Sequence, residues 1–135
     1  MVAAVDVGAI AAAIPPTLLV DVVGDESVVV SDLTHDSRSV RPGFAFACVV
    51  GERADGHDFA EAAVRDGATL LLVERELALD VPQLVVTDVR RAMGPAAAAV
   101  HGHPARSLSL VGITGTNGKT TTTQMLGAIL RSQGL

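Results

Sequence analysis

The stretch GITGTNGKTT, residues 112–121, has the residue types and spacing of a loop that binds the phosphates of a nucleotide. It follows an apolar stretch that should form a strand and precedes a helix predicted to begin near Lys119. Gly115 and Gly118 would let the backbone approach phosphate oxygens closely, where the N–H groups at the start of the helix converge. Lys119 would lie against the β and γ phosphates of the nucleotide, and the Thr120 hydroxyl could bind Mg²⁺.

The charge distribution supports an anionic ligand at this loop. Lys119 is the only lysine among the ten basic residues, so a compact ammonium is specifically placed here where arginine is used elsewhere. All 15 carboxylates lie at or before Asp88, which leaves the last stretch locally positive. The spacing departs from the generic phosphate-binding pattern, because Ile113 stands where that pattern has its first glycine. A turn that uses glycine only for its geometry is the alternative interpretation.

Composition limits the fold and excludes several classes of function. The chain has 135 residues, 49% of them hydrophobic, which is enough for one modest domain and at most part of a second. Aromatic residues make up only 2%, so Val, Leu, Ile and Ala must fill the core, which favours an α/β fold. A net charge of -5 argues against nucleic-acid binding. No apolar run is long enough to span a bilayer and no secretory signal is evident, so we expect a cytoplasmic protein without membrane contact. The lone Cys48, in an apolar stretch, is predicted to be a buried hydrophobe.

Hydrophobic periodicity and turn residues predict alternating helices and strands. Helices are expected at 8–14 with Asp6 as its cap, at 59–66 with an Asp58–Glu61 capping box and a stop at Gly67, at 88–101 with a break or kink at Gly94 and Pro95, and from 119 onward. Strands are expected at 18–23, 27–33, 44–50, 69–74, 83–89 and 108–114. The polar, proline-bearing segment 102–107 is the predicted boundary between a domain at 1–107 and a second segment at 108–135.

Two separate motifs resemble one protein family. The run VGITGTNGKTTTTQML, preceded by HPARSLSL, closely resembles the ATP-binding loop of the Mur ligases, the ATP-dependent amide-forming enzymes of bacterial cell-wall synthesis. Upstream, the Asp-Ser-Arg at 36–38 and Asp-Gly-His-Asp-Phe at 55–59 are similar to signatures of the family's N-terminal domain. The resemblance implies an α/β fold in which a small UDP-binding domain is followed by the first strand, P-loop and helix of a P-loop ATPase domain.

The resemblance also implies ligand contacts. His35 and Ser37 would contact the uridine end of a UDP-sugar, and Glu52, Arg53 and Ala54 would line the side of its diphosphate. ATP would be bound by Gly115, Thr116, Asn117, Gly118, Lys119, Thr120 and Thr121, with Thr120 also on Mg²⁺. Chemistry agrees with two of these roles, because an arginine can pair with a diphosphate oxygen and a serine can donate to a uracil carbonyl.

Within the family, the form of the loop favours the ligase that adds the third peptide residue, meso-diaminopimelate or lysine, to UDP-N-acetylmuramoyl-L-alanyl-D-glutamate through an acyl phosphate. The implied partners are this UDP-N-acetylmuramoyl-dipeptide and an amino acid, and the full-length enzyme is expected to be a monomer. We expect the 135 residues alone to be catalytically inactive, with a mobile or self-associating tail after residue 107. Alternatives are the next ligase of the pathway, a non-catalytic UDP-sugar-binding module, and a folylpolyglutamate synthetase, against which the Asp-Ser-Arg segment argues.

Other polar residues have simpler predicted roles. Asp36 and Arg38 are expected to pair with each other across a turn. His57 is expected to support a turn rather than bind a metal, since its neighbourhood offers no metal partners. His101 and His103 are expected to interact with the end of the preceding helix.

Overall fold

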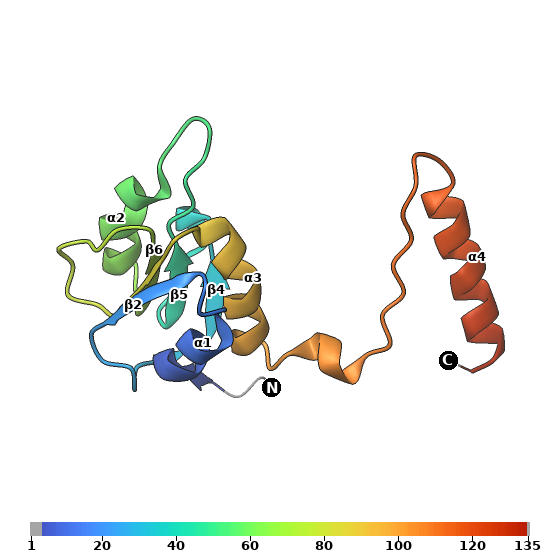
Figure 1. The fold of residues 1–135 in the computed structure, drawn as a ribbon, viewed down its shortest axis with the longest axis horizontal. Coiled ribbons are helices and arrows are strands. Elements are labelled where there is room, and N and C mark those ends of the chain that lie inside the picture. The colour runs from blue at the N-terminus through green and yellow to red at the C-terminus, as the bar shows by residue number, and fades with distance from the viewer. Residues whose placement is uncertain (1–3, 135) are drawn as a thin grey trace. The chain divides into compact units, whose positions relative to one another are not determined.

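The computed structural model describes residues 4–134 and divides the chain into two units, Met1–Pro104 and Ala105–Leu135. The first unit contains nearly all of the regular structure, and the second contains one long helix (Figure 1). Among the described residues, no helix combines the length and the apolar character that crossing a membrane requires.

A five-stranded sheet with the order β2-β7-β6-β5-β4 forms the centre of the first unit. Its strands are β2 (Leu19–Val23), β4 (Asp32–Thr34), β5 (Phe44–Ala47), β6 (Leu70–Val73) and β7 (Gln83–Val86). The strands β4, β5, β6 and β7 run parallel, and β2 pairs antiparallel with β7 at the edge. Two short strands, β1 (Val5–Asp6) and β3 (Val29–Val30), pair separately. The predicted α/β class is confirmed.

Helices cover both faces of this sheet (Figure 1). The bounds are α1 (Val7–Ala13), α2 (Ala60–Arg65), α3 (Val89–Val100), and the 3-10 turns η1 (Ser37–Ser39), η2 (Gly56–Phe59) and η3 (Pro104–Ser107). Because strand side chains alternate between faces, Ala45 and Ala47 of β5 pack in the core under α1 and α3. Phe46 and Cys48 pack on the other face, under α2. The sheet is therefore the middle of three layers.

Most predicted elements are present, with the Asp6 side chain capping α1 through the N–H of Ala9 at 2.7 Å. The expected strand 27–33 is instead two short strands, because β3 pairs with β1 while β4 pairs with β5. The predicted Asp58 cap is wrong. A 3-10 turn precedes α2, and Asp55 caps that turn by accepting the N–H of His57 at 2.9 Å.

The expected break at Gly94 and Pro95 is also wrong, because α3 runs unbroken through both residues. Pro95 removes one helical hydrogen bond. Buried contacts made by Ala92 before it and by Ala96 and Val100 after it hold the helix against the sheet. Core packing thus outweighs the local penalty of proline.

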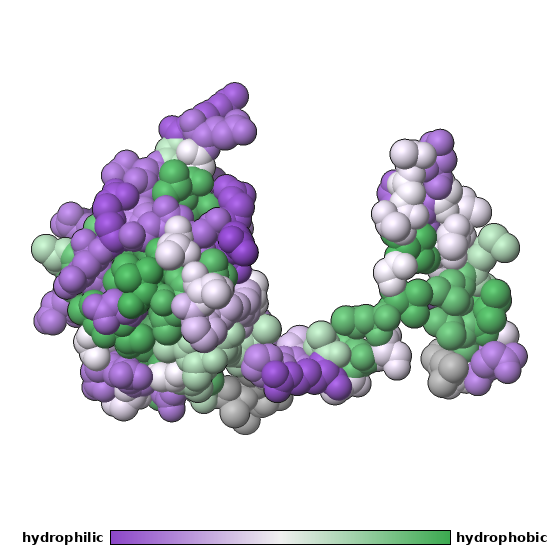
Figure 2. Space-filling view, in the orientation of Figure 1, coloured by the Kyte–Doolittle hydropathy of each residue, from purple (hydrophilic) through white to green (hydrophobic). Residues whose placement is uncertain are grey.

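The second unit consists of an extended segment, a glycine-rich turn and α4 (Lys119–Ser132). The strand predicted at 108–114 is not formed there, because a strand needs a paired neighbour and residues 108–114 have none among the described residues. Apolar side chains of this unit are exposed, among them Leu110 at 70%, Met125 at 62% and Ile129 at 57% (Figure 2). The apolar side chains of α4 therefore have no cover within this unit.

Candidate functional site

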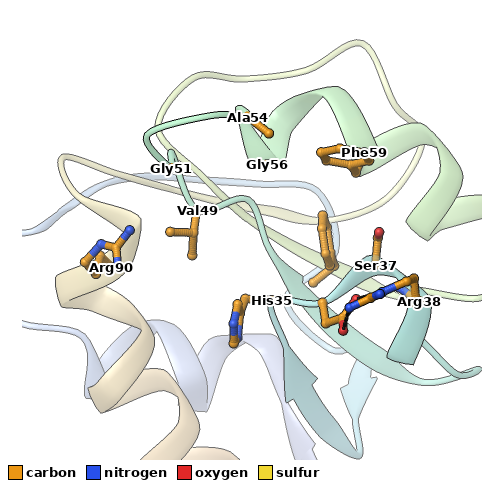
Figure 3. A pocket seen from close by; sticks show the side chains of 11 residues that line it. His35, Ser37, Arg38, Val49, Gly51, Ala54, Gly56, Phe59 and Arg90 are labelled. Carbon is orange, nitrogen blue, oxygen red and sulfur yellow. Dashed lines mark hydrogen bonds and ion pairs between the residues drawn. The ribbon is translucent and has the colours of Figure 1, made fainter.

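A cavity of about 490 Å³ opens at the carboxyl ends of the parallel strands in the first unit. Figure 3 shows its side chains arriving from the loops after β4 and β5 and from the start of α3. The lining residues are His35, Asp36, Ser37, Arg38, Phe46, Val49, Gly51, Ala54, Gly56, Phe59 and Arg90. The carboxyl edge of a parallel sheet is where α/β proteins bind their ligands, since loops converge there above a rigid base.

The segment after β4 forms one side of this cavity. Asp36 caps the η1 turn, and its carboxylate accepts hydrogen bonds from the backbone N–H of Arg38 at 3.0 Å and from Nε and Nη2 of Arg38 at 2.9 and 2.8 Å. These bonds to Arg38 lower the pKa of Asp36 to about 2. The predicted Asp36–Arg38 pair is confirmed. Its consequence is a fixed turn on which Ser37 lines the cavity beside His35.

A tight hairpin after β5 forms the opposite wall. The N–H of Gly51 donates to the carbonyl of Ala54 at 2.9 Å, and that of Gly56 donates to the carbonyl of Val49 at 2.9 Å. Gly51, Ala54 and Gly56 line the cavity, whereas Glu52 and Arg53 at the tip of the hairpin are exposed and do not. Of the five residues predicted to bind a UDP-sugar, the cavity therefore brings together His35, Ser37 and Ala54.

Arg90 is a lining residue that the sequence interpretation missed. It is the second residue of α3, is exposed, and directs its Nη2 to the carbonyl of Val50 at 3.4 Å. No ion pair of Arg90 is found among the described residues, so its guanidinium lines the cavity without a carboxylate partner. The available signal was its position two residues after the helix cap Asp88, close to the carboxyl end of β7 at Val86.

The remaining candidates of the first unit have structural roles. Cys48 is fully buried, and desolvation raises the pKa of its thiol to about 12, which keeps it unreactive. His57 is buried in a hydrogen-bonded turn, as predicted. His101 lies at the end of α3, with Nε2 3.3 Å from the Asp32 carboxylate. Within residues 4–134, no group of three or more His, Cys, Asp or Glu side chains could hold a metal ion.

The glycine-rich loop forms a second concavity, of about 280 Å³, in the second unit. It is lined by Thr116, Asn117, Gly118, Lys119, Thr120 and Thr121. Gly115 and Gly118 have φ angles of 153° and 77°, and only glycine takes such values readily. Lys119 Nζ donates to the carbonyl of Gly115, so the ammonium is folded back over the loop at the start of α4. Six of the seven predicted ATP contacts share this concavity, and Gly115 adjoins it.

These features together define an α/β protein with separate loop-built sites suited to anionic ligands. The sequence model of the Mur ligase family, catalytic domain, matches residues 29–113. The chain belongs to the Mur ligase family.

Individual relatives agree with this assignment. The UDP-N-acetylmuramoyl-L-alanyl-D-glutamate--2,6-diaminopimelate ligase of Geobacillus thermodenitrificans is 52% identical over 102 residues, which are 76% of this chain and 21% of that protein. The crystal structure of MurF from Acinetobacter baumannii is similar with a TM-score of 0.72 at 30% identity, covering 97% of this chain and 28% of that one. MurF ligase from Thermotoga maritima in complex with ADP has a TM-score of 0.60 at 31% identity, covering 76% and 24%. The chain thus spans about a fifth of the length of the curated relative.

Proposed function

We propose that this chain supplies substrate-binding loops of an ATP-dependent amide ligase of the MurE type, which joins an amino acid to UDP-N-acetylmuramoyl-L-alanyl-D-glutamate. The observation that carries the proposal is the cavity that gathers His35, Ser37 and Ala54 on loops after two neighbouring parallel strands. The name of the relative at 52% identity favours 2,6-diaminopimelate as the amino acid. We further propose a cytoplasmic enzyme that acts as a monomer.

In the proposed complex, the cavity of the first unit binds the UDP end of the substrate. The Ser37 hydroxyl would donate to a uracil carbonyl from the turn that the Asp36–Arg38 pair fixes. His35, which directly precedes the Asp36 cap of that turn, would contact the same end of the substrate. Ala54 would approach the diphosphate closely. Glu52 and Arg53 lie at the exposed hairpin tip, from which Arg53 could reach a diphosphate oxygen at the rim of the cavity.

The loop 115–121 would bind the phosphates of ATP. The residues fit this ligand, because Gly118 precedes the free N–H groups at the start of a 14-residue helix and Lys119 Nζ is already directed at the loop backbone. On binding, Lys119 would exchange the Gly115 carbonyl for phosphate oxygens. Thr120 would hold Mg²⁺ through its hydroxyl, and the metal would neutralise charge on the β and γ phosphates of ATP. Only the γ-phosphoryl group would pass to the substrate carboxylate, with ADP as the leaving group.

A MurF-type ligase is the second candidate, and the solved structures of that type favour it. Their identity to this chain is 30 to 31%, whereas the 2,6-diaminopimelate ligase reaches 52% over 102 residues. Similarity of fold does not separate two ligases that share a UDP-binding domain. The higher sequence identity therefore supports the MurE type over the MurF type.

Calorimetric titration of the 135-residue chain with UDP and with ATP tests both sites. We expect Ser37→Ala to weaken binding of UDP about fivefold and to leave ATP binding unaffected, since a hydrogen bond to a ligand contributes about 1 kcal/mol. Lys119→Ala should have the opposite pattern. The matched controls are Ser39→Ala in the same turn and Arg131→Ala at the far end of α4.

The outcomes separate a ligase of either type from a UDP-sugar-binding module. Binding of both nucleotides with this crossed loss supports the ligase. Binding of UDP without ATP would instead support a UDP-sugar-binding module, and binding of neither would refute both.

A further inference from the structure

A hydrogen-bonded network centred on the buried His57 lies next to Gly56 and Arg90, which line the main cavity. Nδ1 of His57 is 2.6 Å from the Asp55 carboxylate, whose other oxygen accepts from Arg75 Nη2 at 2.9 Å. On the opposite side of the ring, Nε2 of His57 accepts the backbone N–H of Glu74 at 2.9 Å. The Glu74 carboxylate then accepts the N–H of Val89 at 3.0 Å. We refer to these five residues as the His57 network.

The partners of His57 define its protonation state. Nε2 accepts from a backbone N–H and therefore carries no proton, so the proton of the neutral ring is on Nδ1 and is donated to Asp55. The side chain of His57 is 0% exposed. Each of the two ring nitrogens therefore makes one hydrogen bond, and the ring is fixed in one orientation.

The network connects two walls of the cavity that are distant in sequence. Asp55 ends the hairpin that supplies Gly51 and Ala54, and the N–H of Gly56 holds that hairpin to Val49. Val89 begins α3 and directly precedes Arg90. A Cβ at Gly56 would lie 2.5 Å from the Val49 nitrogen, so only glycine fits where the hairpin closes beside His57.

We propose that the His57 network positions Arg90 against the hairpin so that Arg90 binds the anionic diphosphate part of the ligand in this cavity. This inference rests on the proposed function. Arg90 is suited to the role because its guanidinium lines the cavity, reaches the Val50 carbonyl and makes no ion pair among the residues described. His57 and Glu74 are positioning residues, since they act through Arg90 and the hairpin without lining the cavity.

Calorimetry with UDP and uridine on the full chain tests the proposal at Glu74. We expect Glu74→Leu to weaken UDP binding about tenfold and to change uridine binding less than about twofold, because the lost contact concerns the diphosphate. Glu74→Gln should restore UDP binding, since its amide oxygen can still accept the Val89 N–H. Glu76→Leu, two residues along the same exposed segment, is the matched control.

A double-mutant cycle and the His57 tautomer make the test specific to positioning. Arg90→Ala should weaken UDP binding as much as Glu74→Leu, and the double variant should lose little more than either single variant. Nitrogen NMR should find the proton of His57 on Nδ1 in the unchanged chain. A structural role alone would lower thermal stability while leaving the ratio of UDP to uridine affinity unchanged.

The possible failures are distinguishable. If the unchanged chain binds UDP and Glu74→Leu binds it equally well, the inference is overturned and the proposed function stands. Additive losses in the cycle would also overturn it. If the unchanged chain does not bind UDP, the proposed function and this inference both fail.

Discussion

The two concavities differ in what holds their loops in place. The cavity of the first unit lies over packed residues such as Phe46, which is 1% exposed, and the His57 network bonds its hairpin to the segment after β6. The glycine-rich loop depends on local features alone, namely glycines with positive φ and the contact of Lys119 with Gly115. A packed core can hold together residues from segments that are distant in sequence. A loop without such a core takes its shape from its own glycines and from the helix that follows it.

Buried area differs correspondingly between the units. In the first, α1, α3 and the sheet share one hydrophobic core and α2 covers a second. In the second, α4 has no buried residue, and the apolar side chains before it are exposed as well. Because burial of apolar area supplies most of folding stability, the difference in stability between the two should be large.

Hydrogen exchange should reveal the largest contrast. Amides of β5 and β6 should exchange on the order of 10³-fold more slowly, relative to unstructured peptide, than those of α4, because core strands open only by global unfolding while an unpacked helix frays. Exchange monitored by NMR at constant pH measures this. Equal protection of β6 and α4 in a monomeric sample would contradict the comparison.

Truncation of an apolar side chain should lower the free energy of unfolding by about 3 kcal/mol more in the first unit than in the second. Leu71→Ala removes a fully buried side chain from β6 and should destabilise the first unit by about 2 to 5 kcal/mol. Ile129→Ala removes one that is 57% exposed on α4 and should change stability by less than about 0.5 kcal/mol. Urea denaturation followed by circular dichroism compares them. A comparable loss for both variants would mean that α4 is packed in solution.

Glycine substitutions test whether the loops are constrained by packing or by local conformation. Gly56→Ala would place a Cβ 2.7 Å from the Cys48 carbonyl carbon and should destabilise the first unit by about 1 to 3 kcal/mol. Gly118→Ala meets no atom within 4 Å, and its cost of about 1 kcal/mol comes from a φ of 77°. It should leave the thermal unfolding of the first unit unchanged. A shift of that transition by Gly118→Ala would disprove the separation.

Local sequence predicted those parts of the site whose geometry is local. The Asp36–Arg38 turn and the glycine-rich loop follow from residues within a few positions of each other, and both were expected. Arg90 was missed because it joins the cavity through the pairing of β6 with β7, which no spacing pattern encodes. The resemblance places Glu52 and Arg53 beside the diphosphate. The hairpin closed by the Gly51–Ala54 hydrogen bond holds both at its exposed tip, and their contact with the ligand stays a prediction.

Errors in the predicted elements have the same origin. The apolar run 108–114 has strand propensity, but a strand requires a partner that the described residues do not offer it. Pro95 should break a helix locally, yet the buried alanines of α3 on both sides of it maintain the helix. In both cases tertiary contacts, present or absent, decide against the local preference.

The acid titration of Asp36 should give the smallest effect. Its pKa is lowered from 3.8 to about 2 chiefly by the Arg38 side chain, so the pair is complete above pH 4 and its contribution is lost as pH falls through about 2. Since Asp36 and Arg38 are largely solvent-accessible, Asp36→Asn should scarcely change stability at pH 7. Carbon NMR of the carboxyl should follow the titration, and Arg38→Ala should raise the pKa toward 3.8. A pKa near 3.8 in the unchanged chain would mean that the Asp36–Arg38 pair does not fix the turn that carries Ser37. This wall of the first cavity would then be held by the core of the unit and not by the local pair.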